Sequence, residues 1–146
     1  MAESDVPKIV SIMKANCLEA YLATADGDQP RVRPVSPIIE DDLSIWVATF
    51  STSRKVRQLS KNPNVCLSFV ERPDGNRAAV ILGRAVTETS PEQRRRVWKS
   101  ATDLAQYVPD GPDSEAYCLL RIEPKQIEWR ESWESGNQVY EPGRSQ

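Results

Sequence analysis

Hydrophobic side chains along this chain fall into short runs that are separated by turn residues. The runs are rich in β-branched, aromatic and leucine side chains, and each has the length of a β-strand. They cover residues 17–25, 31–39, 43–50, 65–70, 78–88, 116–123 and 126–133. Asp26-Gly27 follows the first run and is typical of a tight hairpin. Because short turns join most of the runs, we expect antiparallel neighbours.

Three other segments have helical spacing. They cover residues 5–15, 54–61 and about 91–101. Ser90, with a glutamine three residues later, has the pattern of a capping box. Six or seven antiparallel strands with isolated short helices predict a mainly β protein, a β-barrel decorated with α-helices. We expect a single domain over residues 1–146, with an N-terminal helix within 1–16 and an irregular tail over 135–146.

The composition narrows the function classes. The 146 residues include 19 basic and 21 acidic side chains, a balance that argues against a general nucleic-acid or membrane binder. There is no histidine, which excludes Ser-His-Asp and Cys-His nucleophilic sites and histidine-bound metals. The three cysteines are expected to be reduced and buried. With no membrane-length apolar run and no signal-like N-terminus, we expect a cytoplasmic protein with no metal, nucleic-acid or membrane partner.

The segment TFSTSRKVRQLSKNPNV, residues 49–65, combines hydroxyl side chains with two adjacent cations. If Ser53 caps a helix that begins at Arg54, free N–H groups and the positive end of the helix dipole point outward there. Lys55 adds a mobile charge and Thr49 a neutral hydroxyl. Cations at a helix N-terminus cost about 0.3–1 kcal/mol each unless an anion compensates. The segment therefore favours a phosphate monoester site, with a solvated helix start as the alternative.

A second candidate feature is the pair Arg31 and Arg33, which strand alternation puts on the same side. A cation that points inward beside an apolar core needs a partner, so we expect one of the two to meet an anion. The alternative is that both lie outside the barrel and pair with Glu19, Asp26 or Asp28.

These motifs resemble those of the pyridoxamine 5′-phosphate oxidase-like flavoproteins, whose fold is a split β-barrel. The resemblance is carried by RVRPV, a strand that ends in Ala48-Thr49, SRKVRQLSKNPNV and CLSFV, in that order. It is best over residues 17–88, and the spacing SRK-x-x-QL-x-x-NP is fairly specific. The chain is more similar to the shorter, general-stress-protein type of branch than to the oxidases themselves.

The resemblance implies FMN bound between the two subunits of a homodimer. Arg33 and Lys55 would hold the phosphate, assisted by Ser53 and Arg54. The ribityl chain and the isoalloxazine edge would be lined by Pro34, Val35, Ser36, Ala48 and Thr49. The implied activity is that of a flavin-dependent oxidoreductase, with hydride or electron transfer at flavin N5 and a small-molecule redox substrate.

Two departures from the family pattern argue against vitamin B6 oxidation. The glutamine early in one family strand corresponds to Ala78, and the C-terminal stretch lacks the histidine of the oxidases' substrate-binding segment. Two alternatives stay open. One is a flavin-binding module without turnover, a stress or carrier protein. The other is a deazaflavin-dependent reductase, whose longer anionic tail would call for more cations, with Arg31, Arg54 and Arg57 as candidates.

Two further groups of residues have plain structural interpretations. We expect Arg94-Arg95-Arg96 to form a solvated helix face rather than a nucleic-acid patch. Trp129 and Trp133 are expected in the core or an interface more readily than over a flavin.

Overall fold

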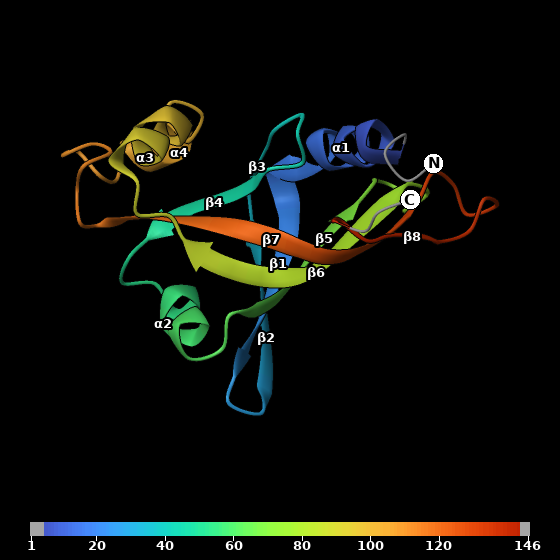
Figure 1. Ribbon diagram of the computed structural model, residues 1–146, viewed down its shortest axis with the longest axis horizontal. Coiled ribbons are helices and arrows are strands. Elements are labelled where there is room, and N and C mark those ends of the chain that lie inside the picture. Colours follow the sequence, from blue (N-terminus) through green and yellow to red (C-terminus); the bar gives the residue numbers. More distant parts are fainter. Residues whose placement is uncertain (1–4, 144–146) are drawn as a thin grey trace.

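The computed structural model describes residues 5–143, except for the side chains of residues 102 and 103, and is built on one curled antiparallel sheet (Figure 1). The strand order is β2-β1-β5-β6-β7-β4-β3, with β8 paired to β7. The strands are β1 (Ala20–Asp26), β2 (Gln29–Val35), β3 (Ile38–Ile39), β4 (Ile45–Phe50), β5 (Asn64–Val70), β6 (Ala78–Thr87), β7 (Tyr117–Arg130) and β8 (Gln138–Tyr140). The predicted mainly β, split-barrel fold is confirmed.

Helices lie at both sides of the sheet. They are α1 (Val6–Ala15), α2 (Arg54–Lys61), α3 (Pro91–Trp98) and α4 (Thr102–Ala105), with a short 3-10 turn η2 at Cys17–Glu19. The first two match the predicted ranges closely. The Ser90 hydroxyl accepts the N–H of Gln93 at 3.3 Å, as the capping box predicts. The predicted third helix is shorter than expected, because α3 ends at Trp98 and α4 forms separately.

Strand β4 separates two apolar clusters. Ile45 and Val47 belong to the larger cluster inside the curled sheet, which α1 also joins. Trp46 and Ala48 belong to a smaller cluster beneath α3 and α4. Because side chains alternate along a strand, one face of β4 looks into the barrel and the other toward these two helices. In Figure 1, α2 lies on the opposite side of β4 and β7 from α3 and α4.

The predicted strand over residues 31–39 is wrong as a single element. It breaks at Ser36-Pro37, so that β2 pairs with β1 while β3 pairs with β4. A proline lacks the N–H that a continuous ladder would use at this point. The break lets the chain pass from one end of the sheet order to the other.

Near the C-terminus, two strands that were predicted separately form one continuous strand. The two predicted runs over 116–123 and 126–133 form one strand, β7, because Pro124 lies at a bulge where the β6–β7 register shifts beside Gly83. The predicted irregular tail also contains β8, which pairs with residues 127–129 of β7. The predicted N-terminal segment and tail also include residues 1–4 and 144–146, which lie outside the described residues.

The Arg94-Arg95-Arg96 run makes intramolecular contacts. Arg94 donates to the carbonyls of Pro112 and Ser114, and its guanidinium lies 4.5 Å from the centroid of the Tyr117 ring. Arg95 pairs with Asp113, and Arg96 pairs with Glu40. Of the two tryptophans, Trp129 is buried in the core, whereas Trp133 is exposed and lies 3.8 Å from the Arg130 guanidinium. The contacts of Arg94, Arg95 and Arg96 therefore hold α3 against neighbouring loops.

Two absences hold for the part of the chain that the structure describes. No helix there has the length and apolar character needed to cross a membrane. Nor do three or more cysteine, aspartate or glutamate side chains there form a group that could hold a metal ion.

We predict that Gly83→Ala destabilises the fold by about 3 kcal/mol, because overpacking against a backbone atom cannot relax without a shift of the backbone. A Cβ at position 83 would lie 2.2 Å from the carbonyl oxygen of Glu123, at the β6–β7 bulge. The measurement is urea unfolding followed by far-ultraviolet circular dichroism. Gly27→Ala is the control, since nothing lies within 4 Å of a Cβ there and only the positive φ of 60° is strained, at a cost of about 1–2 kcal/mol. Equal losses in the two variants would contradict this account of Gly83.

Candidate functional site: a cationic groove and an apolar pocket

A cationic groove of about 690 Å³ opens between the β1–β2 hairpin and α2. Its lining residues are Asp26, Arg31, Val32, Arg33, Arg54, Arg57, Gln58 and Lys61. Five of them are cations and one is an acid. The acid, Asp26, pairs with Arg31, with 3.4 Å between Oδ2 and Nε. Asp26 is one of the partners expected for Arg31 if that arginine lies outside the barrel. The groove therefore keeps a net positive charge that suits an anionic ligand.

The amphipathic pattern of α2 places its cations in the groove. Leu59 is buried and Val56 packs against the core, which fixes the helix on the barrel. The lining residues Arg54, Arg57 and Lys61 are three and four residues apart, so they share the other face of the helix. At about 1.5 Å rise per residue, this row of charges extends for roughly 10 Å along the groove.

Arg33 is held in place by uncharged acceptors. Its Nη2 donates to Gln58 Oε1 at 2.7 Å, and its Nη1 donates to Thr24 Oγ1 at 2.7 Å and to the carbonyl of Leu22 at 3.2 Å. Thr24 in turn donates to Gln58 Oε1. Burial, and then repulsion from Arg31, lower the pKa of Arg33. The side chain is therefore fixed in position while its charge stays uncompensated.

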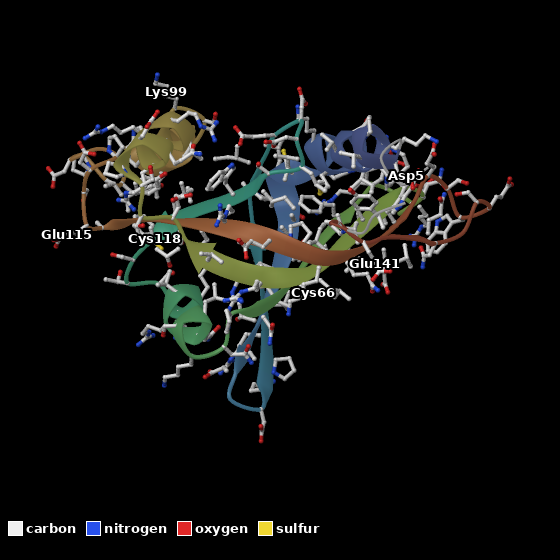
Figure 2. The ribbon with its side chains drawn as sticks, in the orientation of Figure 1. Asp5, Cys66, Lys99, Glu115, Cys118 and Glu141 are labelled. Carbon is white, nitrogen blue, oxygen red and sulfur yellow. The ribbon has the colours of Figure 1, made fainter. Side chains whose placement is uncertain are left out.

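Lys55 is a second half-buried cation close to Arg33. Its Nζ donates to Thr49 Oγ1 at 2.8 Å. Burial, and then repulsion from Arg33, lower the pKa of Lys55. Cys118, labelled in Figure 2 at the start of β7, pairs in register with Thr49, and burial raises the pKa of its thiol. Among the described side chains, no carboxylate forms an ion pair with Arg33 or Lys55.

Ser53 occupies the N-cap position of α2, as predicted, but its side chain does not cap the helix. Its Oγ is buried and has no hydrogen-bond partner among the described residues. A buried hydroxyl without a partner costs about 1–3 kcal/mol. An anion beside Arg33 and Lys55 could accept from this hydroxyl and from the free N–H groups of the first turn of α2. The residues present therefore fit a phosphate group.

A second cavity, the apolar pocket, has a volume of about 500 Å³. Its lining residues are Cys17, Leu18, Ser36, Pro37, Ile38, Ala48, Phe50, Ser100, Ala101, Leu104 and Tyr107. None of these side chains is charged. Ser36 donates to the carbonyl of Leu18 at 2.7 Å, so its hydroxyl is already used at the edge of the pocket.

The nine predicted site residues fall into four groups. Two of them, Arg33 and Arg54, line the cationic groove, and two, Ser36 and Ala48, line the apolar pocket. Thr49, Ser53 and Lys55 lie at the end of β4 and the start of α2. Pro34 is exposed and opposite Tyr21 in the sheet, and Val35 packs against the core.

Sequence reasoning missed Thr24, Gln58 and Lys61. Gln58 and Lys61 could have been found from helical spacing, because they lie four and seven residues after Arg54. Thr24 is the polar residue among the buried positions of β1, which is a weaker signal. Its contact with Arg33 depends on the sheet register and could not be read from either segment alone.

The family model for pyridoxamine 5′-phosphate oxidase matches residues 13–130 of this chain. The chain belongs to the pyridoxamine 5′-phosphate oxidase family. This confirms the resemblance identified from the sequence motifs. The family typically binds a flavin and generally forms dimers, and it also includes members without catalytic activity.

Among individual members of the pyridoxamine 5′-phosphate oxidase family, the chain is 29% identical to general stress protein 26 of Bacillus subtilis over 108 residues, 73% of this chain and 74% of that protein. The structure is similar to that of general stress protein 26 from Bacillus anthracis, with a TM-score of 0.75, 20% identity and coverage of 94% and 98% of the two chains. It is also similar to an FAD-binding protein from Mesorhizobium loti, with a TM-score of 0.65, 20% identity and coverage of 82% and 87%.

We predict that Lys55 titrates below the ordinary lysine pKa of about 10.4 and that Arg33→Gln raises its pKa. Burial and the Arg33 charge both disfavour the protonated amine, and the substitution removes the second of these effects. The measurement is a nuclear magnetic resonance titration of the lysine Cε groups, with Lys55 assigned from Lys55→Arg. Arg95→Gln is the control, because Arg95 pairs with Asp113 instead. A Lys55 pKa that is the same in the parent and in Arg33→Gln would contradict the proximity of the two charges.

Proposed function

We propose that this protein binds FMN and acts as a flavin-dependent oxidoreductase, with Arg33 and Lys55 holding the phosphate. The observation that carries the proposal is the pair of half-buried cations without a carboxylate partner among the described side chains, next to the unsatisfied Ser53 hydroxyl. A bound phosphate dianion would offset the repulsion between Arg33 and Lys55, accept a hydrogen bond from Ser53, and lie at the positive end of α2. Arg54 would add a further charge at the mouth of the groove.

The apolar pocket supports the placement of the isoalloxazine ring. Arg33 and Ser36 are three residues apart, a distance that an extended chain covers in at most about 11 Å. A ligand with a phosphate at one end and a flat apolar ring at the other could therefore reach both the cationic groove and the apolar pocket. On β4, Thr49 contacts Lys55 whereas its neighbour Ala48 lines the pocket. Pro34 and Val35 would then flank the ribityl chain between the two ends.

The protein's own residues would position the flavin rather than exchange protons with the substrate. When bound, the flavin supplies hydride or electron transfer at its N5 atom. With no histidine in the chain, the residues around the ring would exclude water and hold the ring in place. The likeness to an FAD-binding protein supports a flavin in this fold. We choose FMN because a single phosphate accounts for Arg33, Lys55 and Ser53.

A cytoplasmic location remains a prediction.

A deazaflavin-dependent reductase is the second candidate. Arg54, Arg57 and Lys61 form a row of exposed cations along the groove, and no ion pair neutralises them among the described side chains. One phosphate at Arg33, Lys55 and Arg54 leaves Arg57 and Lys61 without a ligand. A cofactor with a longer anionic tail would use them.

We predict that Arg33→Gln and Lys55→Gln each weaken FMN binding by about 1.5–3 kcal/mol, the contribution of a charge-assisted hydrogen bond. This corresponds to roughly a ten- to 150-fold rise in Kd, measured by flavin fluorescence titration. Lys125→Gln is the control, since this exposed lysine contacts Asn64 rather than the groove. Mass analysis of the released cofactor distinguishes FMN from a deazaflavin. Parent-like affinity in both variants would overturn the phosphate placement, and a flavin-bound protein that accelerates no redox reaction would favour the non-catalytic alternative.

A homodimer is proposed from the outer face of the sheet. The register places Val32, Ala23, Cys66 and Leu82 in one row across β2, β1, β5 and β6. The alternate residues of these strands, such as Leu22, are buried, so this row faces outward. Val32 is 67% exposed and Leu82 is 37% exposed. An apolar row of this kind on an open sheet is suited to burial against a second copy. The family is generally dimeric.

We predict that Leu82→Glu converts a dimer into monomers, because it places an unpaired charge within the apolar interface. The dimer dissociation constant should rise by at least about thirtyfold, equivalent to roughly 2 kcal/mol, measured by sedimentation velocity. Ser60→Glu is the matched control, since it adds the same charge at an exposed position on α2. A parent that sediments as a monomer, or a Leu82→Glu variant that stays dimeric, would contradict this interface.

A further inference from the structure

The apolar pocket differs from the cationic groove in charge. Among the side chains that the structure describes, its lining contains no acidic or basic group, while five of the eight residues of the groove are cations. The nearest cation along the α3–α4 segment, Lys99, is exposed and points away from the sheet (Figure 2). A phosphate or carboxylate that entered the pocket would lose hydration without gaining a charged partner, which is costly. The pocket therefore favours an uncharged ligand.

The wall of the apolar pocket suits a flat ring. Phe50 and Tyr107 meet edge to face, with ring centroids 6.3 Å apart and an interplanar angle of 77°. Two apolar side chains remain unusually accessible, since Leu18 is 87% exposed and Tyr107 is 67% exposed. Exposed apolar surface of this kind around a concave site is typical of ligand binding. Aromatic side chains stabilise a ring contact beyond the burial of area alone.

The pocket is also large enough for more than a contact with the flavin edge. Its volume of about 500 Å³ lies within the range of about 300–1,000 Å³ that is usual for small-molecule sites. Ser36 and Ala48, which the proposed function assigns to the isoalloxazine, come from the break after β2 and from β4, whereas Leu104 and Tyr107 come from α4 and the segment after it. A ligand packed against Leu104 and Tyr107 would lie beside the ring.

We propose that the part of the apolar pocket formed by Leu18, Phe50, Leu104 and Tyr107 binds an uncharged planar aromatic molecule, of the quinone class, as the redox substrate. This inference rests on the proposed function. A quinone becomes a hydroquinone by taking up two electrons and two protons. The reduced flavin, as the reductant, would supply both electrons and one proton as a hydride, and water would supply the second proton. The same lining disfavours phosphorylated substrates such as those of vitamin B6 metabolism.

The test is isothermal titration calorimetry of the FMN-loaded and the flavin-free protein with naphthoquinone and with its monosulfonated derivative. These probes share a ring system and differ in charge. We expect the FMN-loaded parent to bind naphthoquinone at least about tenfold more tightly than the sulfonate, a difference of about 1.4 kcal/mol. Tyr107→Ala should weaken naphthoquinone binding by about three- to tenfold, while the control Tyr107→Phe should not. The FMN affinity of each variant is measured in parallel, so that a weakened quinone contact is distinguished from a weakened flavin contact.

A charge added to the pocket provides the opposite readout. Ser100 is an exposed lining residue two positions after the end of α3, so Ser100→Lys introduces a cation without disturbing the core. An exposed cation contributes modestly to an ion pair, so this variant should reduce the preference for naphthoquinone over the sulfonate by about two- to fivefold. An unchanged preference in Ser100→Lys, or equal binding of the two probes by the parent, would overturn the assigned ligand class.

The outcomes separate this inference from the proposed function. If FMN binds normally and the loaded protein binds no naphthoquinone, this inference is overturned and the proposed function stands. If naphthoquinone binds only the flavin-free protein and FMN displaces it, the pocket is the place of the flavin ring alone, and the inference is again overturned. If the parent binds no flavin at all, both proposals are overturned.

Discussion

The burial of two cations, Arg33 and Lys55, without an acidic partner among the described side chains is the constraint on which the arrangement of the candidate site depends. Both charges are half-buried, and the fold supplies only neutral acceptors for them: Gln58 and Thr24 for Arg33, and Thr49 for Lys55. Neutral acceptors fix the direction of a cation but do not cancel its charge. A carboxylate in their place would neutralise the two cations and leave no uncompensated charge to attract an anion. The unsatisfied hydroxyl of Ser53 points to the same conclusion, because the site is more complete with an anionic ligand than without one.

The alternation of β4 explains how one short strand serves two environments. Thr49 faces the cations of the barrel end, whereas Ala48 and Phe50 line the apolar pocket. A one-residue shift of this strand would exchange the two faces and remove both surfaces at once. The pairing of β4 with β7, over six residues from Ile45 to Phe50, fixes the register. The separation of charge across β4 is therefore a consequence of sheet pairing rather than of any single side chain.

The sequence was sufficient to predict features that depend on local spacing. Alternation predicted most strands, and the capping box at Ser90 predicted the start of α3. The strand boundaries near Pro37 and Pro124 could not be predicted from the sequence. Pro37 follows the end of β2, where the chain crosses to the other edge of the sheet, whereas Pro124 lies inside β7 at a bulge. What distinguishes the two prolines is the partner strand, including the close approach of Gly83 to Glu123. The same holds for the candidate site. Its cations could be predicted from the motif, but the contact between Thr24 and Gln58 joins distant segments and could be found only from the structure.

The two surfaces together argue that specificity in this protein is divided between charge and shape. In the proposed function, Arg33 and Lys55 would select a ligand by its phosphate, since charge-assisted hydrogen bonds discriminate strongly against a neutral molecule. The apolar pocket can discriminate only modestly among uncharged rings, because apolar contacts change by about 1–3 kcal/mol for each small group added or removed. A protein built in this way would bind one anionic cofactor selectively and accept several flat, uncharged partners beside it. The absence of histidine fits this division, because the chain then contributes position and environment rather than a group that titrates near neutral pH.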